Sequence, residues 1–153
     1  MSAAAVLEAA RDAGVRIATA ESCTGGLITA ALTEIPGSSR VVDRGFVTYS
    51  NASKIAMLGV RPETLAQFGA VSEEVAAEMA QGALARSDAG VAIAVTGIAG
   101  PGGSEHQPEG RVCFGLALQG SVHTETVEFG ALGRDKVRAG SVDHALSLIL
   151  QAL

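Results

Sequence analysis

The chain has 153 residues, enough for one domain with a full hydrophobic core and too few for two ordinary ones. Hydrophobic residues make up 48% and charged residues 18%, a globular composition that excludes a disordered chain. The formal net charge of −5 comes without a basic stripe, which argues against nucleic acid as a partner. No apolar run approaches the roughly 18 residues of a membrane span, so no membrane partner is expected either.

The number and spacing of cysteines and histidines predict the cellular compartment and whether the chain binds a metal. Cys23 and Cys113 lie far apart without CxxC spacing, which predicts no structural disulfide and a reducing, cytoplasmic location. The first 14 residues lack the basic and apolar regions of a signal peptide. The three histidines, His106, His123 and His144, have no metal-ligand spacing, so neither a metal nor another cofactor is expected.

Apolar spacing and turn residues predict alternating helices and strands along the chain. Helices are expected over residues 2–13, 24–34, 51–58 and 62–68, from the N-cap Ser72 onward, and over 135–153. Strands are expected over residues 15–20, 41–50 with a bulge at Gly45, 89–95, 111–118 and 122–129, the last two forming a hairpin around Gly120. This order predicts an α/β fold: a single three-layer α/β/α domain with a mixed sheet over residues 1–153.

The turn Glu21-Ser22-Cys23-Thr24-Gly25-Gly26 lies between an apolar strand and a helix. In open α/β sheets ligands bind at the carboxyl ends of strands, and the N–H groups of a helix start suit an oxyanion. The turn is neither GxSxG nor a P-loop. By spacing alone Ser22 is more often an N-cap than a nucleophile, and Cys23 more often a small buried residue than a thiolate.

A second glycine-rich turn, residues 96–103, follows the apolar strand 89–95. Two such turns at one edge of a sheet would form a single crevice. Lys54 follows the strand 41–50, where a solvated surface lysine is the plain interpretation; as a general base it would need a lowered pKa. From the residues alone, the chain is an α/β enzyme or binding domain with a polar, glycine-lined site.

Four segments taken together resemble the CinA family. The match is to the carboxy-terminal domain of that family, the nicotinamide-nucleotide amidohydrolase domain of the PncC type. The segments read AESCTGG at 20–26, GFVTYSN at 45–51 followed by Lys54, GAVS at 69–72, and TGIAGP at 96–101. Residues 133–138 also fit the start of that family's last helix. The resemblance extends from about residue 16 to the end of the chain.

The resemblance implies hydrolysis of the carboxamide of nicotinamide mononucleotide to nicotinate mononucleotide and ammonia, without a metal. By motif, Ser22 would be the nucleophile and Lys54 the base that takes its proton. Tyr49 would polarise this pair or relay a proton within it. Such a Ser–Lys pair is a variant of the serine catalytic triad in which lysine replaces histidine as the base.

The resemblance also implies the groups that bind this small-molecule substrate. The N–H groups of residues 23–26 would form the oxyanion hole at the helix N-terminus. The loop 96–101 and either of two arginines would hold the nucleotide, since an arginine fork suits a phosphate. The expected substrate-binding residues are Cys23, Thr24, Gly25, Gly26, Asn51, Thr96, Gly97, Gly100, Arg134 and Arg138.

Two departures from the family pattern stand out. Many members carry an extra amino-terminal domain resembling molybdopterin-binding proteins, and none is expected in this chain. Residues 105–111, EHQPEGR, are more polar than the family's Pro-Val-Gly pattern, with Glu109 and Arg111 as the unusual positions. These residues would affect the local loop shape and substrate detail.

Two alternatives to the Ser–Lys enzyme stay open at this point. One is an amidase in which Cys23 is the nucleophile. The other is a non-catalytic nucleotide-binding or regulatory domain of the same fold, against which the intact set of Ser22, Tyr49 and Lys54 speaks. An alanine-rich, aromatic-poor surface is also compatible with a homodimer, an expectation by analogy.

Overall fold

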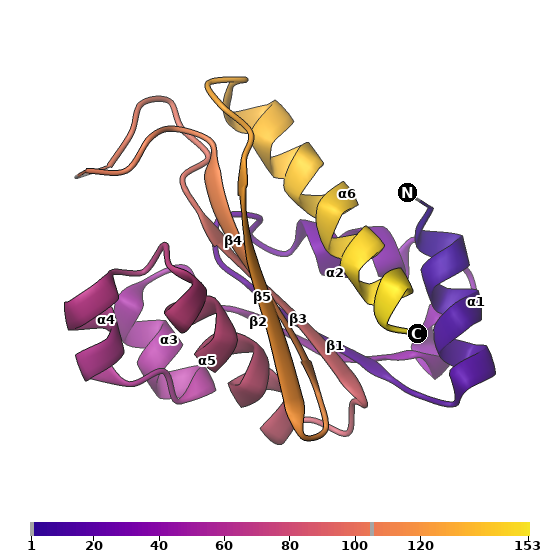
Figure 1. Ribbon diagram of the computed structural model, residues 1–153. Helices are drawn as coiled ribbons and strands as arrows, with labels where there is room; N and C mark the ends of the chain where they lie inside the picture. The colour runs from indigo at the N-terminus through magenta and orange to yellow at the C-terminus, as the bar shows by residue number, and fades with distance from the viewer. Residues whose placement is uncertain (1, 105) are drawn as a thin grey trace.

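The computed structural model describes residues 2–104 and 106–153 and contains a five-stranded mixed sheet (Figure 1). The strands are β1 (Ile17–Glu21), β2 (Val42–Val47), β3 (Val91–Gly97), β4 (Arg111–Leu118) and β5 (Ser121–Glu128). The helices are α1 (Ala3–Ala13), α2 (Leu27–Thr33), α3 (Asn51–Leu58), α4 (Pro62–Phe68), α5 (Glu73–Ala85) and α6 (Arg134–Ala152), with a 3-10 turn at Ser38–Arg40.

The spatial order of the strands is β2-β1-β3-β4-β5. β1 lies between β2 and β3 and pairs with both in parallel, whereas β4 is antiparallel to β3 and to β5. The predicted β4–β5 hairpin around Gly120 is confirmed. Residues Val91–Thr96 of the central strand β3 are all buried, as a strand covered on both faces requires.

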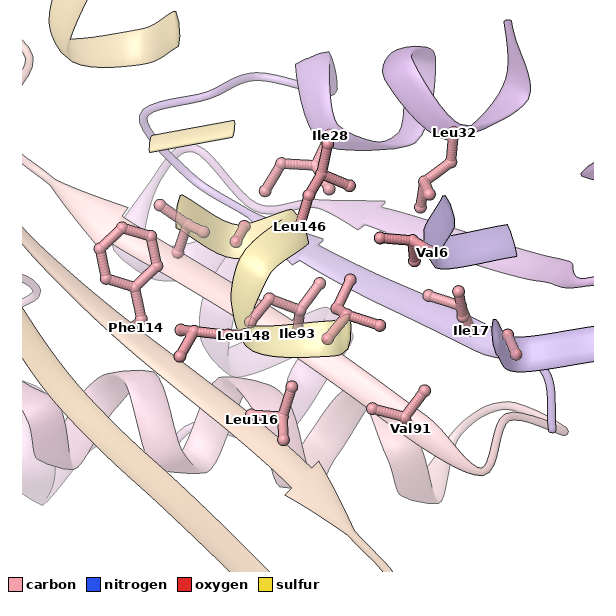
Figure 2. Close-up of a cluster of buried hydrophobic side chains, with 14 of the residues drawn as sticks. Val6, Ile17, Ile28, Leu32, Val91, Ile93, Phe114, Leu116, Leu146 and Leu148 are labelled. Atoms are coloured by element: carbon pink, nitrogen blue, oxygen red, sulfur yellow. The ribbon is translucent and has the colours of Figure 1, made fainter. Parts of the chain in front are cut away.

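Helices cover both faces of the sheet, α1, α2 and α6 on one and α3, α4 and α5 on the other (Figure 1). The larger core fills the first interface, where Ile93 of β3 and Phe114 of β4 lie among Ile28, Leu146 and their neighbours (Figure 2). The smaller core packs Ala92 and Ala94 of β3 against α5. The period-2 alternation of large and small residues along β3 therefore assigns each face to one helix layer. The predicted α/β/α fold class is confirmed.

The predicted bulge at Gly45 is wrong. β1 pairs Ile17 with Val42 and then Ala18 with Arg44, so the extra residue is Asp43. The Asp43 carboxylate lies 2.6 Å from Nε of Arg44 and accepts the N–H of Asp88 at 3.0 Å, which holds this residue out of the ladder. A glycine is needed at position 45 for a different reason. A Cβ there would lie 2.6 Å from the hydroxyl oxygens of both Thr19 and Thr29.

Helix boundaries follow their capping residues. Ser72 accepts the N–H of Val75 at 3.2 Å, which confirms the predicted N-cap of α5. Helices α3 and α4 have the predicted bounds, and α6 continues through Gly140. Helix α2, however, begins at Leu27, three residues later than predicted, because residues 22–26 form a separate turn. No helix in the described ranges is both long and apolar enough to cross a membrane.

Candidate active site

The carboxyl ends of the parallel strands β1, β2 and β3 meet at one edge of the sheet and enclose a cavity of about 190 Å³. This is the crevice that the two glycine-rich turns predicted. Its lining residues come from the turns after these strands, from the start of α3, from the loop before α5 and from the start of α6. They are Ser22, Cys23, Tyr49, Asn51, Lys54, Ala70, Val71, Thr96, Gly97, Ala99 and Arg134.

At the base of the cavity, Lys54 Nζ donates to Ser22 Oγ at 2.9 Å. Helix α3 positions this lysine: Ser50 caps the helix by accepting the N–H of Ser53 at 3.1 Å, and Lys54 follows in the first turn. Its ammonium also donates to the carbonyl oxygens of Thr48 at 2.9 Å and Tyr49 at 3.4 Å. Serine and lysine, 32 residues apart in the sequence, thus form a buried pair.

Lys54 is 1% exposed, and burial lowers its pKa from the ordinary value of 10.5. Among the described residues its Nζ makes no ion pair with a carboxylate. The charge of a Cys23 thiolate opposes the effect of burial on the pKa of Lys54, but burial is the larger cause. A lysine in this state releases its proton more readily than a surface lysine. It can therefore act as a general base toward the serine hydroxyl.

Cys23 lines the same cavity but is less suited than Ser22 to act as a nucleophile. It is 6% exposed and belongs to the larger hydrophobic core. Burial raises the pKa of its thiol to about 11, so the thiolate is scarce at neutral pH. The structure therefore favours Ser22 over Cys23 as the nucleophile.

Sequence analysis gave no role to the charged residue of this turn, Glu21, which is completely buried. Its carboxylate accepts hydrogen bonds from the hydroxyls of Thr24 at 2.6 Å and Thr29 at 2.9 Å. It also accepts the backbone N–H groups of Gly26 at 3.2 Å, Ile28 at 2.9 Å and Thr29 at 3.0 Å. An acidic residue ending an apolar strand, with threonines three and eight positions later, was the signal in the sequence.

Glu21 changes where an oxyanion could bind. Its carboxylate already occupies the N-terminus of α2, so the predicted use of that helix start for the oxyanion is wrong. The N–H of Gly25 donates to the carbonyl of Ser22 at 3.0 Å, which removes a further candidate. Within the described part of the chain, the N–H groups of Cys23 and Thr24 donate to no carbonyl and to no side chain of another residue. Cys23 lines the cavity whereas Thr24 is fully buried, so the Cys23 N–H remains available to an oxyanion.

We expect Glu21→Gln to lower the free energy of unfolding by about 2 kcal/mol, because an amide nitrogen would face N–H donors in a buried site. We also expect a lower kcat, because the turn that carries Ser22 loses hydrogen bonds to the Glu21 carboxylate. Chemical denaturation measures the first effect. Glu8→Gln, an exposed change on α1, is the control and should change stability by less than about 0.5 kcal/mol. Equal stability of Glu21→Gln and the wild type would contradict this role.

Tyr49 and Arg134 form the rim of the cavity. Tyr49 is 62% exposed, and its phenol oxygen accepts a hydrogen bond from Nη2 of Arg134 at 2.8 Å. Nη1 of Arg134 donates to the carbonyl of Gly100 at 2.8 Å. Only the backbone carbonyl of Tyr49 contacts Lys54, so the geometry does not support the predicted phenol relay within the Ser–Lys pair.

Arg138 lies behind the turn, and its guanidinium faces the backbone instead of the cavity. Nε donates to the carbonyl of Cys23 at 3.1 Å and Nη2 to that of Thr24 at 3.4 Å. Of the two arginines predicted to hold a phosphate, Arg134 alone lines the cavity. Four other predicted binding residues also fall outside the lining, namely Thr24, Gly25, Gly26 and Gly100.

The loop before α5 supplies lining residues to which sequence analysis gave no role. Ala70 and Val71 close one wall, and Thr96, 1% exposed, donates its hydroxyl to the carbonyl of Ala70 at 2.8 Å. The unusual residues of the 105–111 segment have structural partners: Glu109 accepts the N–H of Gly102, and Arg111 pairs with Glu128 at 2.6 Å. Glu105 lies outside the described residues.

Across residues 2–104 and 106–153, no three or more His, Cys, Asp or Glu side chains are grouped so that they could hold a metal ion. The cavity brings together a hydroxyl, an amine and a backbone N–H at the carboxyl edge of the parallel strands. These parts define a serine–lysine site on a three-layer α/β scaffold.

The comparisons with known proteins show the family to which this fold belongs. The model of the CinA C-terminal domain family matches residues 1–153, and the chain belongs to this family. The nicotinamide-nucleotide amidohydrolase PncC of Escherichia coli K12 is 48% identical over 145 residues, covering 94% of this chain and 88% of that protein. A CinA-like protein of Chlorobium phaeobacteroides is 54% identical over 92% of this chain.

Solved structures give the same result. The crystal structure of the competence damage-inducible protein A from Klebsiella pneumoniae superimposes with a TM-score of 0.94 at 41% identity, covering 97% of this chain and 92% of that one. The competence/damage inducible protein from Agrobacterium tumefaciens reaches 0.90 at 50% identity, over 96% and 94%. The chain spans about a third of the length of the first curated relatives it matches.

Proposed function

We propose that this domain hydrolyses the carboxamide of nicotinamide mononucleotide to nicotinate mononucleotide and ammonia, with Ser22 as nucleophile and Lys54 as general base. The observation that carries the proposal is the 2.9 Å contact between Lys54 Nζ and Ser22 Oγ, made by a lysine whose pKa burial lowers. The 48% identity to a nicotinamide-nucleotide amidohydrolase supports the substrate class.

In the first half-reaction, neutral Lys54 takes the proton of Ser22 Oγ as this oxygen attacks the carboxamide carbon. The carbonyl oxygen becomes an oxyanion, which we assign to the N–H of Cys23, the residue after the nucleophile. The Lys54 ammonium then donates its proton to the leaving nitrogen. The C–N bond breaks, ammonia departs and an ester of Ser22 remains.

In the second half-reaction, water replaces ammonia. Lys54, again neutral, takes a proton from this water as its oxygen attacks the ester carbon. The same N–H receives the second oxyanion. When the ester bond breaks, Lys54 returns the proton to Ser22 Oγ. The new carboxylic acid gives its own proton to water, and nicotinate mononucleotide leaves as the carboxylate.

Arg134 is our choice for the substrate phosphate, because it lines the cavity, is exposed at the rim and carries a permanent charge. Asn51, in the first turn of α3, lines the cavity beside Lys54 and offers an amide to the substrate. Tyr49 holds Arg134 by its phenol oxygen. We therefore assign Tyr49 a part in placing the phosphate.

The proposal predicts an acid limb in the pH dependence of kcat/KM. Lys54 acts only when neutral, so kcat/KM should fall about tenfold per pH unit below the pKa of Lys54 in the free enzyme. Because burial lowers this pKa from 10.5, the limb should end below that value. Initial rates of ammonia release across pH measure the profile. A rate that stays constant down to acidic pH would contradict the role of Lys54.

Ammonia release from three substrates tests the function itself: nicotinamide mononucleotide, nicotinamide riboside and free nicotinamide. Release from the mononucleotide with much lower kcat/KM for the other two would support both the reaction and recognition of the phosphate. Tight binding of the mononucleotide without any ammonia would instead favour a non-catalytic nucleotide-binding domain.

A further inference from the structure

The turn that carries Ser22 is held from behind by a charged side chain of a distant helix. Arg138 of α6 donates from two nitrogens of one half-buried guanidinium to the carbonyls of Cys23 and Thr24, 115 and 114 residues earlier. These are the two central residues of the turn that the Gly25 N–H closes onto the Ser22 carbonyl at 3.0 Å. Arg138 thus holds the Cys23–Thr24 and Thr24–Gly25 peptides of the turn, while the Gly25 N–H holds the Ser22–Cys23 peptide.

The direction of these carbonyls determines where the N–H groups point. A trans peptide points its C=O and N–H in opposite directions. With the Ser22 carbonyl turned inward to Gly25, the Cys23 N–H leaves the turn on its outer side. With the Cys23 carbonyl turned toward Arg138, the Thr24 N–H points away from Arg138. Of these two residues Cys23 lines the cavity, whereas Thr24 is fully buried, so the Cys23 N–H is the one that a substrate can reach.

Gly25 allows the guanidinium to come close. Its φ of +57° lies in the left-handed region, and a Cβ at this position would stand 3.4 Å from Nη2 of Arg138. Arg138 itself does not line the cavity, so it does not touch a substrate bound there.

We propose that Arg138 is a positioning residue of the oxyanion hole: by holding the carbonyls of Cys23 and Thr24 it fixes the turn whose Cys23 N–H receives the oxyanion formed on attack by Ser22. This inference rests on the proposed serine mechanism. It assigns different tasks to the two arginines of α6, because Arg134 faces the cavity and Arg138 faces the backbone of the turn.

The test compares Arg138→Ala, Arg138→Gln and Arg138→Lys with Lys136→Ala, which removes an exposed cation from the same helix. On nicotinamide mononucleotide, the first two variants should lower kcat about 10- to 100-fold and leave KM within about threefold. The same loss should appear with nicotinamide riboside, which lacks the phosphate. Arg138→Lys should fall between Arg138→Ala and the wild type, because an ammonium keeps the charge but cannot hold both carbonyls as a fork does.

A second measurement does not depend on the nicotinamide substrate. A small alkyl fluorophosphonate reacts with an activated serine: an O–P bond forms, the P–F bond breaks, fluoride leaves and the serine proton passes to Lys54. The phosphoryl oxygen then needs the same N–H donor. Arg138→Ala should slow labelling of Ser22 about 10- to 100-fold, whereas Lys136→Ala should stay within about twofold of the wild type.

Thermal melts show which variants are folded. If Arg138→Ala does not fold, the same measurements are made on Arg138→Lys. A higher KM for the mononucleotide, with kcat and labelling rate unchanged, would overturn the proposal and make Arg138 a phosphate ligand. Unchanged kcat and labelling in a folded variant would overturn it as well. Labelling that depends on Arg138 in a protein that releases no ammonia would overturn the proposed function and support this assignment. Absence of both reactions in the wild type would overturn both.

Discussion

Ser22→Ala should abolish most of the activity, with kcat/KM for nicotinamide mononucleotide lower by about 10³- to 10⁶-fold. The hydroxyl is the only part of the side chain that the substitution removes, and Lys54 Nζ lies 2.9 Å from it. The alanine variant still offers the backbone N–H groups and the cavity. Substrate affinity should therefore change little, and the loss should appear in kcat.

The matched control is the neighbouring residue. Cys23→Ala removes a thiol that is buried in the core and has a pKa raised to about 11, so it should cost less than about tenfold in kcat/KM. Thermal melts should show a modest loss of stability in this variant, since the sulfur fills core volume. Full activity in Ser22→Ala together with loss in Cys23→Ala would reverse the assignment of the nucleophile.

Replacement of Lys54 should be nearly as damaging. We expect Lys54→Met and Lys54→Arg each to lower kcat by at least about 10³-fold: methionine has no basic nitrogen, and a guanidinium stays charged and cannot accept the serine proton. Steady-state ammonia release measures both. The conservative arginine change is the sharper of the two, because it keeps a donor and a positive charge. Substantial activity in Lys54→Arg would show that Lys54 acts as a donor and not as a base.

The lowered pKa of Lys54 has a second consequence that does not involve catalysis. Between its lowered pKa in the folded protein and 10.5 in the unfolded chain, the unfolded state binds more protons at this residue. The contribution of Lys54 to the free energy of unfolding therefore rises with pH across that interval. Lys54→Met lacks this contribution, so the difference in stability between wild type and variant should shift in favour of the wild type as pH rises. A constant difference would contradict the lowered pKa.

Much of the fold followed from local signals in the sequence. Helices α3 and α4 and strand β4 were predicted with their observed bounds, and Pro62 marks the start of α4 in the sequence. The bulge could not be placed, since a glycine in a strand and a carboxylate with distant partners look equally plausible from the sequence. Asp43 leaves the ladder because of Arg44 and the N–H of Asp88, and the latter contact is tertiary.

The catalytic pair was predicted less directly. Spacing alone left Ser22 as an N-cap and Lys54 as a surface lysine, and only the resemblance joined them across 32 residues. The structure supplies the physical reason: α3 buries Lys54 to 1% exposure and points its amine at the serine. Glu21 and Arg138 could not be assigned from sequence, because their partners are backbone groups whose directions only the folded turn defines.

The most direct test of the central claim is to trap the ester. Wild-type protein is mixed with less than one equivalent of nicotinamide mononucleotide labelled at the carboxamide carbon, quenched in acid at successive times and mapped by peptide mass spectrometry. We expect the label to appear transiently on Ser22 and to be absent in Ser22→Ala. Label on Cys23, or ammonia release at the wild-type rate by Ser22→Ala, would contradict the serine–lysine mechanism.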